Sequence, residues 1–301
     1  MIIGVLCVLG VVAFWSFTPF LIVTALQFVD PFTLAFLRLV QGLTLVVLLH
    51  RMRTGSFRGM FCFERSILMG SVGITINYVL FIVALNYTTA SMGGLVVQIQ
   101  FVTLAGLAWL VLREPFGAMK IAAVVVIIVG VSLVFVQERI VSDLMKPEYV
   151  LGNSVMLVAG VGWGVYAVSN KSLSRRKSNY EILIPIFSIA TIVAFVAALI
   201  GYEVRATMTM VGLISIVILG TGVTGIGFLL MSTGLRRLNA SLVGAITSVS
   251  PLFNIFISHW LLGEPLSPML FASAFVIIIG ILGIIQADRS RSRRQAARPG
   301  P

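Results

Sequence analysis

The chain has 301 residues, of which 59% are hydrophobic and 10% are charged. Soluble domains carry about 45–50% apolar and about 25% charged residues, so this composition excludes a protein that folds in water. The net charge is +11, and the two cysteines, Cys7 and Cys62, form neither a disulfide framework nor a metal motif.

The apolar runs are long enough to cross a bilayer, which takes about 20 residues per helix. We therefore expect an all-α integral membrane protein. Residues 2–25 lack the basic start of a signal peptide, so we interpret them as a membrane span. Ten spans are predicted in chain order, near 2–25, 32–50, 66–87, 92–112, 117–137, 151–170, 180–201, 209–232, 241–261 and 266–286.

The second half of the chain repeats the first. Residues 84–133 and 234–283 align without a gap and share 13 identical residues in 50. Further upstream, Trp15 matches Trp163 at a separation of 148. Internal repeats in a very apolar chain are typical of membrane transporters. We predict a five-helix repeat at 1–137, an outer linker at 138–150, a second five-helix repeat at 151–287 and a basic tail at 288–301.

Lys and Arg predict the orientation. With the N-terminus inside, the inner connectors and the tail carry 17 of the 21 Lys and Arg residues. The outer connectors carry three, which are Arg139, Lys146 and Arg205. Both termini are therefore expected in the cytoplasm, and the basic charge is expected to face lipid headgroups rather than nucleic acid. Five spans per half is an odd number, so the two repeats are expected to be inverted.

The chain resembles the EamA-type branch of the drug/metabolite transporter superfamily. The resemblance rests on Ala13–Ser16, on the segment 30–38, and on Glu114-Pro115 and Glu264-Pro265 before the last helix of each half. It covers about 3–286 and implies transport of amino acids or other metabolites. The family pattern places proline in the ninth span, as at Ser250-Pro251. The fourth span has Gln100-Phe101 at the matching place, so no proline-assisted bend is expected there.

Arg38 is the one charge well inside a predicted span. A charge there costs several kcal/mol unless it is paired or reaches the interface, which makes Arg38 a functional candidate. It lies about 9 Å below the expected outer face at 1.5 Å per residue. Two roles remain open, namely snorkelling to the outer headgroups and contact with an anionic group of a substrate.

Aromatic and amide side chains at mid-span indicate a substrate cavity. Helix packing and interhelical hydrogen bonds are the alternative for each of them. The polar candidates concentrate in spans three, four, eight and nine. The resemblance to the EamA-type branch implies that these spans line one cavity. Together with Arg38, the cavity candidates are Trp15, Asn77, Gln98, Gln100, Trp163, Tyr166, Thr224, Ser248 and Asn254.

The two Glu-Pro pairs allow two interpretations. An acid followed by proline suits the start of a helix and its dipole. Because the pairs fall on opposite faces of the membrane, they are also gate candidates. The residues concerned are Glu114, Pro115, Glu264 and Pro265.

Several functions are disfavoured by missing residues. No acid is predicted at mid-membrane, which argues against proton-coupled antiport of cationic drugs. His50 and His259 lie in different spans on opposite faces, and 220–225 matches GxGxxG without a surrounding βαβ unit. We therefore expect no enzyme activity, cofactor or metal site.

The expected function is alternating-access transport of a small organic metabolite across the cytoplasmic membrane, with export of amino acids or related compounds as the leading hypothesis. The alternatives are a membrane-embedded enzyme and a non-transporting interaction protein. The expected partners are a small-molecule substrate and the lipid bilayer, not nucleic acid, and a homodimer is left open.

Overall fold

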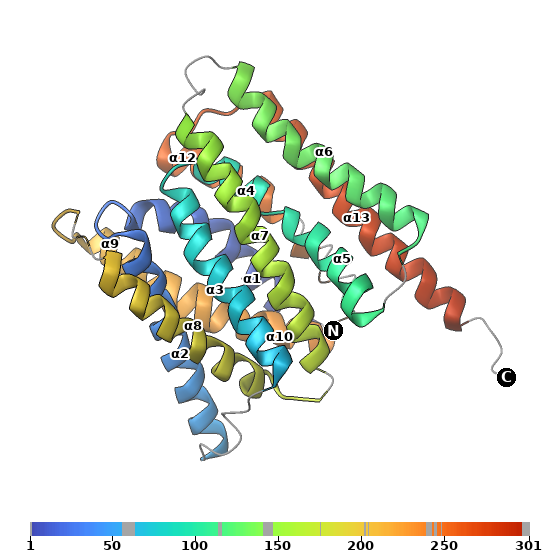
Figure 1. The fold of residues 1–301 in the computed structure, drawn as a ribbon, viewed down its shortest axis with the longest axis horizontal. Helices are drawn as coiled ribbons and strands as arrows, with labels where there is room; N and C mark the ends of the chain where they lie inside the picture. The colour runs from blue at the N-terminus through green and yellow to red at the C-terminus, as the bar shows by residue number, and fades with distance from the viewer. Residues whose placement is uncertain are drawn as a thin grey trace.

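A computed structural model describes residues 2–55, 64–113, 116–140, 147–174, 176–201, 203, 205–238, 243, 246–247 and 249–296, and the side chains of 135–140, 235 and 288–296 are not described. Within these ranges the protein is all-helical (Figure 1). The first half contains α1 (Ile2–Ala25), α2 (Pro31–Thr54), α3 (Arg65–Leu85), α4 (Ala90–Val96), α5 (Ile99–Leu112) and α6 (Ala118–Ile140). The second half contains α7 (Pro147–Leu173), α8 (Asn179–Gly201), α9 (Met210–Val217), the π-helix η2 (Ile218–Ile226), α10 (Gly227–Arg237), α12 (Ser250–Leu262) and α13 (Pro268–Ala296).

Among the described residues, 8 helical stretches are long and apolar enough to span a membrane. In two of them, Ala90–Leu112 and Met210–Gly234, successive helices run on with little interruption. Large apolar side chains cover much of the outside, and Ile200 and Trp260 are 84% and 77% exposed. Lipid solvates such a surface whereas water would not, so the chain is a multi-pass membrane protein.

Local sequence explains the helix ends. The Asp30 carboxylate accepts hydrogen bonds from the backbone N–H groups of Phe32 and Thr33, and Pro31 occupies the first turn of α2. Gly55 ends α2 and Gly263 ends α12, both in the left-handed conformation that glycine adopts without a steric penalty.

The fourth predicted span is interrupted at Val97 and Gln98, although it contains no proline. The backbone N–H of Gln98 donates to the carbonyl of Leu95, and the side-chain amide of Gln98 donates to the carbonyl of Gly94 at 3.1 Å. The side chain thus satisfies the carbonyl that the tighter backbone turn leaves without an amide partner. As expected, no proline bends this span, and the helix is interrupted where the Gln98 side chain supplies the hydrogen bond instead.

The ninth predicted span, 241–261, is described as a helix from Ser250 onwards. Only 243, 246–247 and 249 are described in its earlier part, so the predicted start lies outside the described residues. The predicted linker 138–150 is shorter in the structure, because α6 extends to Ile140 and α7 begins at Pro147. Residues 141–146 between these helices lie outside the described residues.

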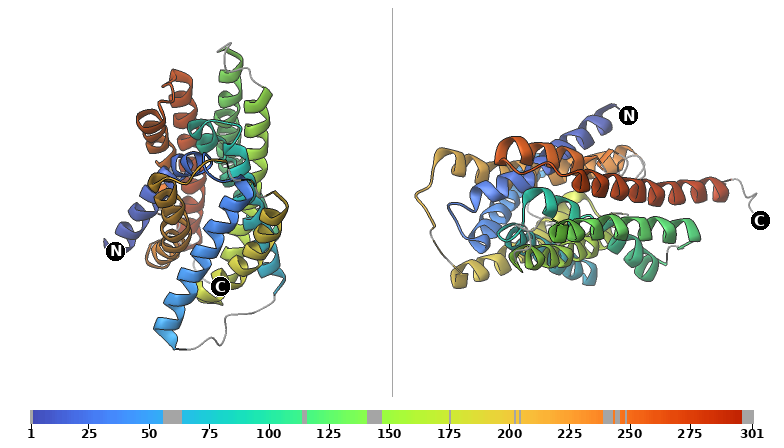
Figure 2. Two further views of the ribbon diagram at one scale, coloured as in Figure 1. Left: turned by 90° about the vertical axis from the view of Figure 1, so that its left-hand side faces the viewer. Right: turned by 90° about the horizontal axis from the view of Figure 1, so that it is seen from above.

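α6 and α13 run side by side along one flank of the molecule (Figure 1; Figure 2, right). Their contact is reciprocal. A Cβ atom at Gly130 would lie 2.7 Å from Cγ1 of Ile277, and one at Gly280 would lie 2.5 Å from Cγ1 of Ile127. Gly130 and Gly280 are 150 residues apart, as are Ile127 and Ile277, so equivalent residues exchange equivalent contacts.

α7 is held between α3 and α5 by small residues on opposite faces. A Cβ atom at Gly162 would lie 2.7 Å from the carbonyl oxygen of Gly73 on α3. A Cβ atom at Gly164 would lie 2.5 Å from Cγ2 of Thr103 on α5. α7 approaches both neighbours this closely because glycine has no side chain. This is the usual reason for glycine at helix interfaces in membranes. This packing places Trp163 and Tyr166 beside α3.

Candidate functional site

A pocket lies between the two halves of the chain. The empty space within it amounts to about 830 Å³, a value that includes the open space at its mouth. Its walls are mostly apolar, with a few amides and hydroxyls. Its lining includes Trp15, Thr18, Pro19, Arg38, Asn77, Tyr78, Phe81, Gly94, Val97, Gln98, Gln100, Phe101, Trp163, Val223, Phe228, Thr247, Ser250, Pro251 and Asn254.

Two pairs of aromatic rings frame the pocket. The centroids of the Trp15 and Trp163 rings are 5.4 Å apart with planes at 89°, an edge-to-face contact. Those of Tyr78 and Phe228 are 6.3 Å apart. Trp15 and Trp163 are matching positions of the repeat, and Tyr78 and Phe228 are separated by the same 150 residues as the aligned blocks. Equivalent residues therefore meet each other across the pocket.

The walls between these rings repeat in the same way. Val97 and Thr247 both line the pocket, as do Gln100 and Ser250, and each pair is 150 residues apart. Gln100 follows the interruption between α4 and α5, and Ser250 begins α12. The pocket is thus assembled from corresponding parts of the two halves.

Arg38 lies inside this pocket rather than at the surface of the protein. Its side chain is 4% exposed, and its Cζ atom lies 4.6 Å from the centroid of the Tyr78 ring, which is cation–π geometry. Its Nε atom has no hydrogen-bond partner among the described residues. The geometry therefore differs from the snorkelling that the sequence left open, because packing against Tyr78 turns the guanidinium inward.

The predicted amides in the lining are held by hydrogen bonds. Asn77 donates from Nδ2 to the carbonyl of Ala159 at 2.9 Å, which joins α3 to α7. Gln100 donates from Nε2 to Oε1 of Gln98 at 3.2 Å. Asn254 donates from Nδ2 to the carbonyl of Ser16 at 3.4 Å. Asn77 and Asn254 thus join neighbouring helices and also line the pocket.

Three predicted cavity residues do not belong to the lining. Tyr166 is buried behind Trp163, with ring centroids 5.4 Å apart, and its hydroxyl accepts from Nδ2 of Asn170. Thr224 is buried on η2, where its Oγ1 accepts from the hydroxyl of Tyr78 at 3.3 Å and donates to the carbonyl of Leu219. Ser248 lies outside the described residues.

The sequence interpretation missed Tyr78, Phe81 and Phe228, which line the pocket. Each looks like an ordinary apolar residue of a membrane helix. Continuing the alignment of the repeats six residues upstream would have paired Tyr78 with Phe228 and singled out both.

Glu264 caps a helix of the other repeat. Its two carboxylate oxygens accept from the backbone N–H groups of Ala90 at 2.7 Å and Ser91 at 3.0 Å, at the start of α4. A negative charge is stabilising at this end of a helix. The expected helix start at Glu264-Pro265 is thus replaced by Ser267 and Pro268, since the Ser267 side chain accepts from the N–H of Met269. Glu114 and Pro115 lie outside the described residues.

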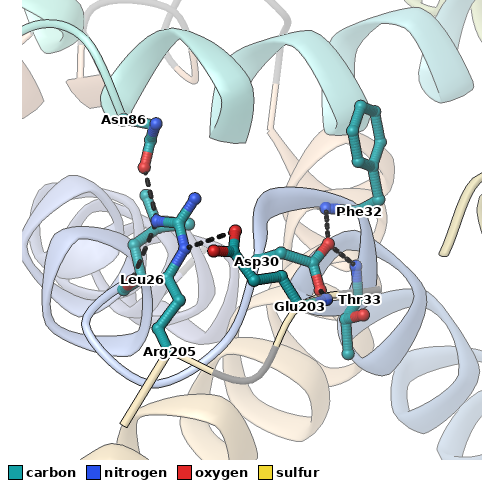
Figure 3. A network of polar contacts seen from close by, with 7 residues as sticks. All are labelled: Leu26, Asp30, Phe32, Thr33, Asn86, Glu203 and Arg205. Atoms are coloured by element: carbon teal, nitrogen blue, oxygen red, sulfur yellow. Dashed lines mark hydrogen bonds and ion pairs between the residues drawn. The ribbon is translucent and has the colours of Figure 1, made fainter. Parts of the chain in front are cut away.

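A second polar network ties three loops together at the same end of the bundle (Figure 3). The Arg205 guanidinium donates to Oδ1 of Asn86 at 2.7 Å and to the carbonyl of Leu26 at 3.2 Å. It also pairs with the Glu203 carboxylate at 3.7 Å, and the backbone N–H of Glu203 donates to Asp30. The α1–α2, α3–α4 and α8–α9 loops are therefore joined at this end.

The described residues contain no group of three or more His, Cys, Asp or Glu side chains placed to hold a metal ion.

The sequence profile of one family matches both halves of the chain, at residues 2–136 and 150–286. The chain belongs to the EamA-like transporter family. The predicted resemblance is confirmed, and the chain is a drug/metabolite transporter of EamA type.

Relatives of this EamA-like transporter carry transporter names. An uncharacterized inner membrane transporter of Escherichia coli, YhbE, is 25% identical over 287 residues, which cover 93% of this chain and 87% of the relative. An uncharacterized transporter of Methanothermobacter thermautotrophicus is 28% identical over 205 residues, 67% of this chain and 58% of the relative, so the match spans little more than half of that protein. A solved crystal structure with 18% identity aligns with a TM-score of 0.69 over 94% of this chain and 97% of its own, and supports the fold alone.

Proposed function

We propose that this EamA-like transporter moves a small organic metabolite across the cytoplasmic membrane by alternating access, and that it exports amino acids or related compounds. The observation that carries the proposal is the contact between Trp15 and Trp163. Equivalent residues of two repeats can touch only close to the axis that relates the repeats. Since Trp15 and Trp163 touch and both line the pocket, we infer that this axis passes close to the pocket. A pocket on such an axis can face either side of the membrane through an exchange of conformations between the halves.

The contact between α6 and α13 supports inverted repeats. Gly130 meets Ile277 where Gly280 meets Ile127, and reciprocal pairs of this kind are the signature of a two-fold relation. These pairs make α6 and α13 antiparallel, which fits an axis in the membrane plane. We infer ten spanning helices in two inverted repeats with both termini in the cytoplasm.

The bonds at the α4 end of the bundle support a gate there. Glu264, from the second repeat, holds the start of α4. α4 lines the pocket at Gly94, and Val97 lines it directly after the end of α4. The side-chain oxygen of Asn254 lies against Gly94, so α12 and α4 form one seam. The orientation inferred from Lys and Arg places this seam at the outer face. Breaking it is the step that would open the pocket outward.

The direct test is uptake into proteoliposomes of labelled amino acids, nucleosides and organic cations, with and without a pH gradient. Saturable uptake of one class, lost in a pocket variant, would establish transport and name the class. Uptake of no compound by folded, inserted protein would contradict the proposal.

Replacing Glu264 by glutamine is expected to loosen the seam. The amide has one acceptor oxygen and no charge, so one of the two charge-assisted bonds is lost and the other is weakened. Hydrogen bonds to charged groups contribute about 1.5–3 kcal/mol, which corresponds to a roughly tenfold or larger rise in the outward-open population. The measurement is the labelling rate of Val97→Cys, in a Cys7→Ser/Cys62→Ser background, by an impermeant maleimide applied from outside.

The matched control is Glu148→Gln, which removes an exposed charge at the start of α7. Its labelling rate is expected to equal that of the parent protein. Equal labelling rates for E264Q and the parent protein would contradict the proposal that a gate lies at this end.

The two rival functions lack comparable support. A membrane-embedded enzyme needs clustered acid, base or metal-binding groups at its pocket, and the described lining offers amides, hydroxyls, aromatic rings and Arg38. An interaction protein would have no use for a pocket framed by equivalent residues of two repeats.

A further inference from the structure

Arg38 is a buried charge without an anionic partner among the described residues. The described salt bridges, at Glu64 and at Arg205, lie at the ends of the bundle, and none includes Arg38. Burying a guanidinium costs several kcal/mol unless an opposite charge or hydrogen bonds compensate. The Tyr78 ring offsets part of this cost, yet the Nε–H still lacks an acceptor. The pocket therefore contains a positive charge that no described anionic group neutralises.

The same pocket contains two further polar atoms without partners. Oδ1 of Asn254 and Oγ of Ser250 are both buried and accept no hydrogen bond from a described residue. Unpaired buried polar atoms are unfavourable in a native structure, and here three of them belong to residues that line one cavity. Arg38 offers a charged donor, whereas Asn254 and Ser250 come from α12 and offer acceptors.

The charge is not part of the repeated framework. Among the pocket residues, Trp15 has its counterpart in Trp163 at 148 residues, and Tyr78 has its counterpart in Phe228 at 150 residues. The counterpart of α2 in the second half is α8, whose one charged residue is Glu181 in its first turn. Arg38 departs from the symmetry, as a residue that selects the cargo would.

We propose that Arg38 binds the carboxylate of the transported molecule, and that the cargo is a small organic carboxylate with an apolar body and a hydrogen-bond donor that meets Asn254 and Ser250. This inference rests on the proposed transport function and names its substrate class. The guanidinium can bind a carboxylate through two parallel hydrogen bonds, which a neutral amide cannot reproduce. The rings of Trp15, Trp163 and Phe228 then pack against the apolar body.

The test compares compounds that share one apolar body and differ in the polar groups. Each set contains an amino acid, the acid without the amino group, the primary amide of the amino acid, and the amine without the carboxylate, with bodies from a methyl to a benzyl group. Binding to the full-length protein in detergent is followed by intrinsic fluorescence in a Trp109→Phe/Trp260→Phe background. The signal then comes from Trp15 and Trp163 in the pocket, because Trp109 and Trp260 are exposed on the outside.

In the wild-type pocket the amino acid of at least one set is expected to bind about ten- to a hundredfold more tightly than its amide or amine. The acid without the amino group is expected to fall between them. Arg38→Gln is expected to abolish the preference for the carboxylate. Arg38→Lys is expected to retain it with weaker affinity, because lysine keeps the charge without the planar fork.

Two kinds of result would overturn the assignment. One is tighter binding of amides or amines than of carboxylates by the wild-type protein, a result that needs no variant and stands even where R38Q does not fold. The other is an R38Q protein that folds and still prefers carboxylates. Saturable uptake of amides or amines alone would remove the role of Arg38 and leave transport intact, whereas no uptake of any member would remove the proposed transport function itself.

Discussion

Replacing Trp163 by alanine is expected to lower the initial rate of transport at least about tenfold, which corresponds to about 1.4 kcal/mol. The indole contacts three other rings, those of Trp15, Tyr166 and Phe228, at centroid distances of 5.4, 5.4 and 5.7 Å. Its removal takes away one wall of the pocket and the partner of Trp15 in the other half. The measurement is uptake into proteoliposomes at matched protein content.

Trp109→Ala is the control for the loss of an indole. Trp109 lies on α5 with half of its surface exposed to the outside, so transport by this variant is expected to match the wild type. Trp163→Phe keeps a ring and is expected to recover part of the rate. Full transport by W163A, with insertion and folding verified, would show that the pocket is not the transport site.

Replacing Gly73 by alanine is expected to destabilise the protein by about 1–3 kcal/mol and to lower its Tm in detergent. The added Cβ atom would lie 2.6 Å from the backbone nitrogen of Tyr166 and 2.7 Å from the carbonyl oxygen of Gly162. Both atoms belong to the α7 backbone and cannot rotate away, so α3 and α7 must separate. Because α7 carries Trp163, transport is expected to fall as well.

Gly106→Ala separates this steric effect from the general effect of alanine in a helix. A Cβ atom at Gly106 on α5 would meet no atom within 4 Å, so the change is expected to leave the Tm equal or slightly higher. Equal Tm values for G73A and G106A would contradict the close contact between α3 and α7. Purified protein is heated in detergent, and unfolding is followed by the loss of helical circular dichroism.

The sequence by itself determined the solvent, the membrane helices and the duplication. Each of these features can be read from the order of residues along the chain, because a bilayer requires long apolar runs and a repeat leaves matching residues at constant spacing. The family assignment follows from the same information. Of the pocket residues, Trp15 and Trp163 could be found because both the residue type and the repeat position are unusual.

The tertiary structure decided which way the side chains face. Arg38 could lie against headgroups or in a cavity, and its packing on Tyr78 turns it inward. Glu264 could begin its own helix, and instead it caps α4 of the other repeat. By residue type alone, the lining residues Tyr78 and Phe228 could not be told from lipid-facing residues. Lipid is as apolar as the protein interior, so membrane helices lack the polar face that reveals orientation in water, and only the packing of neighbouring helices shows which side lines the pocket.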